Sequence, residues 1–159
     1  MYANLYFEDY VPGSARTTYG RTVTAADLAF HQRHLGGEFP PLSQAETAAL
    51  SGAAPQVAPG TLVFTFAIGL TALSAPINGA AFTYGYDRLQ FPHPVRTGDT
   101  LHVRVSIASC APDPKRPDHG RVVEACETIN QHGQTVFTCD HLLLVQRRSQ
   151  QPEDGKGNS

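Results

Sequence analysis

The chain has 159 residues, with 12 Lys and Arg against 14 Asp and Glu, and a formal net charge of -2 at pH 7. This length suits one domain with its own hydrophobic core, and the charge balance argues against binding to a nucleic-acid backbone. Hydrophobic residues make up 41% and charged residues 16% of the sequence, which is typical of a folded globular protein and excludes a largely disordered chain.

The cysteines and the apolar segments bear on the cellular location. An odd number of cysteines, three, fits a reducing compartment better than a disulfide framework. The first ten residues include Glu8 and Asp9 and lack the basic start and apolar run of a secretory signal. The densest apolar stretch, residues 61–75, is shorter than the ~18 to 20 residues that span a bilayer. We therefore expect a cytoplasmic protein with no membrane span.

The first elements are predicted to be a short strand and a helix. Residues 15–23 are rich in Thr, Tyr and Arg, which indicates a strand. Thr24 is placed as a helix N-cap with Asp27 at the third helical position, so a helix should follow over residues 25–35. Two glycines end this helix, and two prolines then hold the chain extended. A short helix over residues 44–50 is expected within an otherwise loop-like segment.

An apolar helix and four strands are predicted for the rest of the chain. Residues 60–74 are apolar on nearly every side, so this helix should be enclosed by the rest of the fold. The pattern then changes to a period of two, which predicts strands over residues 80–91, 100–109, 121–130 and 135–146. The turns between them, at residues 97–99, 112–120 and 131–134, predict antiparallel hairpins.

A sheet of successive antiparallel strands that curls around one apolar helix is an α+β arrangement. We expect a single domain over residues 1–146. Residues 147–159 are without apolar side chains and are expected to form a disordered tail.

Short stretches along the whole predicted domain match one family pattern. They are residues 7–10 with Gly13, residues 20–24 with Asp27, residues 57–60, and residues 89–101. The last contains the form F-x-x-P-V-x-x-G-D-T-L and is the most specific of them. Over roughly residues 6–146 the chain resembles the MaoC-like, (R)-specific enoyl-thioester hydratases and dehydratases. The resemblance implies a single hotdog fold, in which an antiparallel sheet wraps around a central hydrophobic helix.

The resemblance also implies a substrate and a mechanism. The substrate would be an acyl thioester of coenzyme A or of an acyl-carrier protein, bound at the interface of a homodimer. In the family, an Asp and a His of a D-x-N-P-x-H segment activate water for addition to the β-carbon or reverse that step. A backbone amide at the start of the central helix receives the thioester oxygen, and here it would belong to Gly60 or Thr61. Pro59 replaces the family's histidine before this glycine and cannot donate a hydrogen bond.

The acid/base segment of this chain differs from the family pattern. An alignment on Pro41 places Glu38 at the position of the family's Asp and Ser43 at the position of its His. An alignment on Pro40 leaves neither group at its position. The sequence leaves both registers open, and in both of them the family's histidine is missing.

Candidate acid/base groups nevertheless surround this segment. Glu38 would act as the general base if burial raises its pKa toward neutrality; otherwise it is a solvated glutamate after a helix. His34 would supply the missing imidazole, or else it is a surface residue. Ser43 would hold a water molecule, or else it caps the predicted helix over residues 44–50.

Other polar and aromatic groups have weaker functional interpretations. Tyr84 and Tyr86 are placed as substrate-binding residues, because their strand lies against the acyl tunnel in the family; ordinary strand pairing is the alternative. His31 and His141 are each predicted to be packed histidines, in the core or, for His141, at an interface. The sequence contains no ligand set with metal spacing, no G-x-G-x-x-G and no P-loop, so we expect no metal and no cofactor.

The leading hypothesis is a hydro-lyase that adds or removes water across the α,β bond of an acyl thioester. Three alternatives stay open at this point. They are a thioesterase that activates water at the carbonyl, an enzyme that adds a nucleophile other than water, and a non-catalytic hotdog subunit that binds acyl thioesters.

Overall fold

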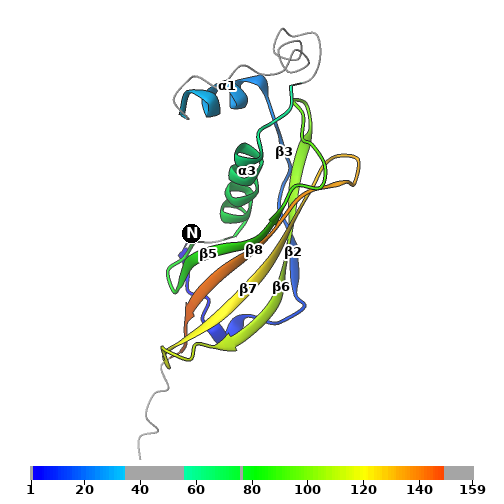
Figure 1. Ribbon diagram of the computed structural model, residues 1–159. Helices are drawn as coiled ribbons and strands as arrows, with labels where there is room; N and C mark the ends of the chain where they lie inside the picture. The colour runs from blue at the N-terminus through cyan, green and yellow to red at the C-terminus, as the bar shows by residue number, and fades with distance from the viewer. Residues whose placement is uncertain (1, 35–55, 76, 149–159) are drawn as a thin grey trace, which may run out of the picture.

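A computed structural model describes residues 2–34, 56–75 and 77–148. It contains one long, curved sheet with a central helix packed against it, and a separate two-stranded sheet (Figure 1). The elements are, in chain order, β1 Tyr2–Ala3, η1 Phe7–Asp9, β2 Ala15–Thr17, β3 Arg21–Thr22, α1 Ala25–His34, α3 Gly60–Leu73, β4 Ile77–Asn78, β5 Ala81–Gln90, β6 Thr100–Pro112, β7 His119–Ile129 and β8 Thr135–Gln146. The helix predicted over residues 44–50 lies outside the described residues.

The main sheet has the strand order β2-β6-β7-β8-β5. The short strand β3 pairs with the first two residues of β6, Thr100 and Leu101. The predicted hairpins β6-β7 and β7-β8 are confirmed. The hairpin predicted between β5 and β6 is wrong, because β5 pairs antiparallel with β8 instead. The loop over residues 91–99 carries the chain from one edge of the sheet toward the other, so the turn at residues 97–99 does not close a hairpin.

This loop fixes the chain segment that precedes α3. The amide of Ala58 donates to the carbonyl of Val95 at 2.8 Å, and the amide of Thr97 donates to the carbonyl of Gln56 at 2.8 Å. Within the loop, Asp99 Oδ2 accepts from the amide of Arg96 at 2.8 Å. The most specific family motif of the sequence therefore has a structural role here, since it anchors the start of the central helix.

The strand predicted over residues 15–23 is divided into β2 and β3. Thr18 lies between them, and its amide donates to the carbonyl of Val103 at 2.9 Å. Its hydroxyl accepts a hydrogen bond from the amide of Val103, also at 2.9 Å, in place of a backbone carbonyl. This side-chain hydrogen bond interrupts the regular ladder while keeping the chain on the sheet.

The predicted N-cap of α1 is confirmed. The amide of Thr24 donates to Asp27 Oδ2 at 2.8 Å, and the amide of Asp27 donates back to the Thr24 hydroxyl at 3.2 Å. This is a capping box with Asp in place of the usual Glu. Arg21 binds the same carboxylate at 2.7 Å and lies over the ring of Phe66 in α3, so the cap also ties α1 to the central helix.

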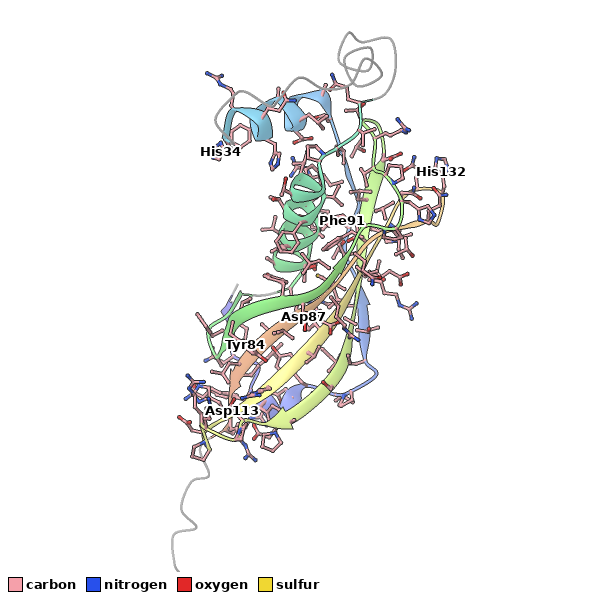
Figure 2. The ribbon with its side chains drawn as sticks, viewed as in Figure 1. His34, Tyr84, Asp87, Phe91, Asp113 and His132 are labelled. Atoms are coloured by element: carbon pink, nitrogen blue, oxygen red, sulfur yellow. The ribbon has the colours of Figure 1, made fainter. Side chains whose placement is uncertain are left out.

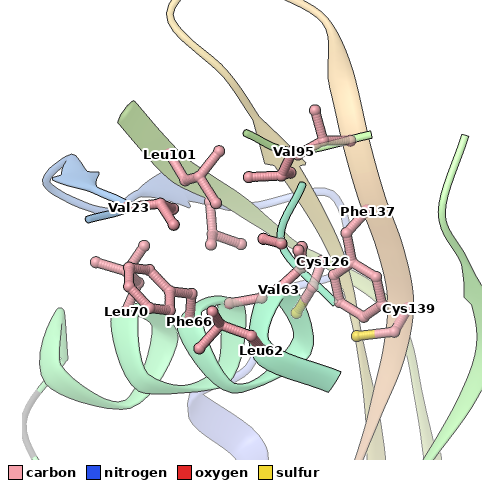
Figure 3. Packing of buried hydrophobic residues seen from close by; sticks show 14 of the residues in the cluster. Val23, Leu62, Val63, Phe66, Leu70, Val95, Leu101, Cys126, Phe137 and Cys139 are labelled. Carbon is pink, nitrogen blue, oxygen red and sulfur yellow. The ribbon is translucent and has the colours of Figure 1, made fainter. Parts of the chain in front are cut away.

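The buried face of α3 forms the main hydrophobic core with the sheet (Figure 3). Val63, Phe66 and Leu70 pack in one cluster with Leu101 and Phe137, which are fully buried. The helix is not enclosed on every side in the described part of the chain: Leu73 is 74% exposed. The expectation of full enclosure is therefore wrong for the described chain, because one sheet covers only one side of a helix.

The two ends of the described chain meet at the far end of the sheet. The ring of Phe7 occupies the space where a side chain on Gly120 would lie. Arg147 contacts Glu8 at 3.2 Å, and Arg148 contacts Asp9 at 2.6 Å. Arg147 and Arg148, which were predicted to begin a disordered tail, therefore form ion pairs with the N-terminal segment. The rest of the predicted tail, residues 149–159, lies outside the described residues. No described helix is both long enough and apolar enough to cross a membrane.

Candidate functional site

The family resemblance predicts that the reacting carbonyl binds at the amino end of α3. Pro59 is the N-cap residue and makes no side-chain cap hydrogen bond. Its carbonyl accepts from the amides of Leu62 and Val63, at 2.9 and 3.1 Å. The amides of Gly60 and Thr61 therefore begin the helix, at the positive end of its dipole.

A close approach of an aromatic ring explains the glycine at position 60. A Cβ atom on Gly60 would lie 3.2 Å from two ring carbons of Phe91, which is tighter than ordinary van der Waals contact. Phe91 follows β5 and lies beside α3 (Figure 2). Its ring also contacts the buried Phe137, at a centroid distance of 4.9 Å. Glycine allows this ring to pack directly against the start of the helix.

His31 reaches the same place from α1. Its Nε2 atom lies 2.8 Å from the hydroxyl of Thr61. The histidine is half-buried, and a packed core histidine was predicted here. The structure instead places a titratable ring at the start of α3, a position that the helical spacing of α1 alone did not reveal.

The predicted acid/base residues are only partly described. Glu38 and Ser43 lie outside the described residues, so their roles stay predictions. His34 is exposed at the end of α1 (Figure 2), and its ring contacts Phe30 at a centroid distance of 4.7 Å. His31 thus lies at the start of α3, whereas the ring of His34 contacts Phe30 within α1 itself.

The two predicted substrate-binding tyrosines point in different directions. Tyr84 is exposed on β5 and does not line the cavity described next. Tyr86 is half-buried, packs edge-on against Phe64 of α3 at 5.1 Å and stacks on His141 at 4.8 Å, measured between ring centroids. Tyr86 thus faces the space between the helix and the sheet.

A cavity of about 560 Å³ lies along the second half of α3. It is bounded by the helix from Ala67 onward, by the N-terminal segment, and by β5, β7 and β8. Most of its wall is apolar, with Ile68 and Leu143 among the lining residues. A concave, largely apolar space with a few polar groups is typical of small-molecule sites.

Four of the polar residues on the cavity wall form a connected network. Glu124 of β7 binds Arg16 of β2 at 2.9 Å through Oε1, and it contacts Nδ1 of His141 at 3.0 Å through Oε2. The other ring nitrogen of His141 lies 2.8 Å from the hydroxyl of Thr83 on β5. Sequence analysis missed Glu124, Arg16 and Thr83, and predicted His141 only as a packed histidine.

The environment of Glu124 favours its charged form. The carboxylate side chain is only 5% exposed, and this burial by itself raises its pKa. The hydrogen bond to His141 and the charge and hydrogen bond of Arg16 outweigh the burial and leave the pKa of Glu124 below its usual value of 4.5. Glu124 is therefore an ionised acceptor at neutral pH.

This network predicts a measurable pH dependence of stability. A carboxylate with a depressed pKa in the folded state stabilises the protein above its ordinary pKa, and this contribution is lost as the pH falls through the folded-state value. Glu124→Gln should therefore reduce the loss of unfolding free energy between pH 7 and pH 4, measured by urea denaturation. It should also lower stability at pH 7, because Arg16 and His141 lose their charged partner. An acid-dependent loss equal to that of the wild type would contradict this assignment.

The described residues contain no group of three or more His, Cys, Asp and Glu side chains that could hold a metal ion. Cys126 and Cys139 face each other across β7 and β8 and also line the cavity, as free thiols. The hydrogen bond with Cys139 and then burial raise the pKa of the Cys126 thiol well above its usual range, so it stays protonated.

Comparisons with known proteins agree with this architecture. The family model described as the FAS1-like dehydratase domain region matches residues 11–139. Protein MaoC of Klebsiella aerogenes is 33% identical over 101 residues, which are 64% of this chain and 30% of that protein. The chain thus spans less than a third of the length of this curated relative.

Solved structures show the same fold. The MaoC-like dehydratase of Rhodospirillum rubrum is 28% identical, with a TM-score of 0.75, over 92% of this chain and 100% of that chain. A Mycobacterium tuberculosis protein described as having a double hotdog fold is 25% identical, with a TM-score of 0.70, over 98% of this chain and 48% of that chain. This chain corresponds to one hotdog unit, which confirms the predicted fold class. The chain therefore belongs to the FAS1-like dehydratase family, as a MaoC-like protein with the hotdog fold.

Proposed function

We propose that this protein is a hydro-lyase that adds water to, or removes water from, the α,β bond of an acyl thioester. The observation that carries the proposal is the family match over residues 11–139, which includes the start of α3. Pro59 makes no side-chain cap hydrogen bond at this helix start, which supports the proposal that the first amides of α3 bind the thioester oxygen.

Hydration proceeds in two steps, addition of water and then protonation. A base takes one proton from water, and the water oxygen bonds to the β-carbon. The π electrons move to the thioester oxygen, which becomes an enolate held by the amide of Gly60 or Thr61. The enolate then collapses as the α-carbon takes up a proton, and the product is a 3-hydroxyacyl thioester. Dehydration is the reverse sequence.

Glu38 is proposed as the acid/base group and His34 as its partner, with Ser43 holding the water. The roles of Glu38 and Ser43 rest on the alignment of the chain with the family pattern on Pro41, and the role of His34 rests on its position four residues before Glu38. The His31–Thr61 contact adds an imidazole at the start of α3, where Pro59 replaces the family's histidine. Tyr86 is proposed to line the acyl site, since it faces the cavity.

The proposed active form is a homodimer joined through the edge strand β5. This strand pairs with β8 on one side, and it exposes Phe82, Tyr84 and Leu89, which are 66%, 47% and 43% exposed. If a second copy pairs with this edge strand, it covers the apolar side chains and forms hydrogen bonds with the backbone groups at the edge. Sedimentation analysis should then give twice the chain mass of 17.1 kDa.

The three cysteines are free thiols, which fits the proposed cytoplasmic location.

The activity is tested by incubating the protein with crotonyl-CoA and with longer trans-2-enoyl-CoA esters. We expect loss of the enoyl absorbance without release of free thiol. Thiol release with no loss of that absorbance would instead favour the thioesterase. Tight binding of saturated acyl-CoA with neither reaction, also with carrier-bound substrates, would favour a non-catalytic subunit and overturn the proposal.

A further inference from the structure

Two cysteines lie opposite each other on neighbouring strands beside the cavity. Cys126 of β7 and Cys139 of β8 are direct partners in the antiparallel ladder. Both belong to the cluster of side chains that packs against α3, and both line the cavity of about 560 Å³ (Figure 3). Both are free thiols. The sheet therefore holds two sulfur atoms side by side in a wall that a small molecule can reach.

The register of the ladder suits a disulfide bond between these two residues. The pairing of β7 with β8 is regular from His119 to Thr128, so the two side chains project from the same face without a stagger. Directly opposite residues of an antiparallel pair have Cα atoms about 4.5 or 5.5 Å apart. A disulfide bond joins Cα atoms that are about 4.4 to 6.8 Å apart. Neither strand therefore has to move for Cys126 and Cys139 to be joined.

The contact between the two thiols makes one of them the better nucleophile. Cys126 donates its proton in a hydrogen bond to Cys139, which raises the pKa of Cys126 and lowers the pKa of Cys139. The thiolate, and not the thiol, is the form of cysteine that attacks an electrophile. Cys139 is therefore the residue that reacts first, with Cys126 next to it as the second thiol.

The third cysteine shows what a thiol without such a partner looks like in this chain. Cys110 of β6 is opposite Val122 in the ladder, and its Sγ atom donates to the carbonyl of Tyr10 at 3.7 Å. Burial raises the pKa of the Cys110 thiol, so it stays protonated. A free cysteine of this kind packs as a small apolar residue. Cys126 and Cys139 differ from it because each has a second thiol in register.

We infer that Cys126 and Cys139 form a reversible disulfide bond, which makes the cavity wall a site of oxidation by hydrogen peroxide. The Cys139 thiolate attacks one oxygen of the peroxide, and the O–O bond breaks. Cys139 becomes a sulfenic acid, and the other oxygen leaves as hydroxide, which takes up the proton that Cys139 had lost and becomes water. The Cys126 sulfur then attacks the sulfenic sulfur, and the S–S bond forms as a second water leaves with the Cys126 proton. The two thiols lose two electrons in total, and the peroxide accepts them.

The position of the pair in a sheet also favours easy reduction of the bond. Opposite residues in a ladder have Cβ atoms about 4.5 to 5.5 Å apart, whereas a disulfide bond draws them to about 3.5 to 4.5 Å. Closing this gap costs energy, and disulfide bonds that store such energy are reduced more readily by thiols. Transient disulfide bonds of this type are the ones that occur in reducing compartments. The dithiol is therefore the resting form, and peroxide produces the disulfide.

The inference is tested by counting thiols after oxidation. The reduced protein is treated with hydrogen peroxide, unfolded in the presence of an alkylating reagent and analysed by mass spectrometry. We expect the wild type to lose two of its three thiols, with a mass decrease of about 2 Da before alkylation. Proteolytic fragments should show Cys126 joined to Cys139, and reduced glutathione should restore all three thiols. An unchanged number of thiols, a disulfide bond that includes Cys110 or joins two chains, or oxidation that glutathione does not reverse would overturn the inference.

Cys110→Ala is the matched control, because it removes the thiol that has no thiol opposite it. This variant should still form the disulfide bond and lose both of its remaining thiols. Cys126→Ala should form no disulfide bond within the chain and should stop at the sulfenic acid of Cys139, which dimedone labels. A Cys139 without label in this variant would overturn the order of the two steps. The thiol count of the wild type needs no substitution and no enoyl thioester, so it tests the inference independently of the proposed function.

Discussion

Replacing Glu38 by Gln should lower kcat for enoyl-thioester hydration about 100- to 10,000-fold, the range that a positioned general base contributes. Glutamine keeps the size and hydrogen-bonding capacity of the side chain but cannot take a proton from water. The measurement is the rate of loss of enoyl absorbance under saturating substrate. Binding of a saturated acyl-CoA should change little, because the carboxylate is proposed to act on the reacting water rather than on the thioester.

Glu46→Gln is the matched control for this prediction, since it removes another carboxylate from the same stretch of sequence. It should leave kcat within about twofold of the wild type, as a residue outside the proposed acid/base group does. His34→Gln should lower kcat less than Glu38→Gln, because His34 is proposed only as a partner. Turnover that is unchanged in Glu38→Gln would remove Glu38 from the mechanism.

Phe137→Ala should lower the unfolding free energy by about 3 to 5 kcal/mol, the usual loss when a buried aromatic side chain is removed. Phe137 is fully buried in β8 and contacts both Phe64 and Phe91, so its removal leaves a cavity between the sheet and α3. Because Phe91 packs on Gly60, the start of α3 should also become less ordered. Urea denaturation measures the first effect, and amide exchange at Gly60 and Thr61 measures the second.

Phe30→Ala is the comparison for this substitution. Phe30 is 66% exposed in α1, and alanine favours the helix, so stability should stay within about 0.5 kcal/mol of the wild type. A loss in Phe137→Ala no larger than that in Phe30→Ala would show that Phe137 does not carry the packing of α3 on the sheet.

Local patterns in the sequence were enough to predict the longer elements of this fold. The Thr24–Asp27 capping box, the apolar helix α3 and the alternating strands β6, β7 and β8 all depend on residues close together in the chain, and each is confirmed. The position of Glu124 between buried Val122 and Cys126 was also visible as a carboxylate on an inward face of a strand. The turn at residues 131–134 does not by itself place Glu124 opposite His141, because the register shifts by one residue between Thr128 and Ile129.

The sequence could not supply the partners of this pair. Arg16 reaches Glu124 from β2, and Thr83 reaches His141 from β5, across 108 and 58 residues of chain. The pairing of β5 with β8 rather than β6 depends on the path of the loop over the start of α3. Such long-range pairings depend on how the strands and the helix pack together in the folded protein. A pattern of neighbouring residues in the sequence does not predict them.

The sequence by itself determined the family, the central apolar helix and the glycine at its start, because motifs and periodicity are local properties of the chain. Only the tertiary structure decided that Phe91 covers Gly60, that His31 contacts Thr61, and that the polar network lines a cavity at the other half of the helix. These contacts join residues from separate strands and helices, and their geometry is set by the packing of α3 on the sheet.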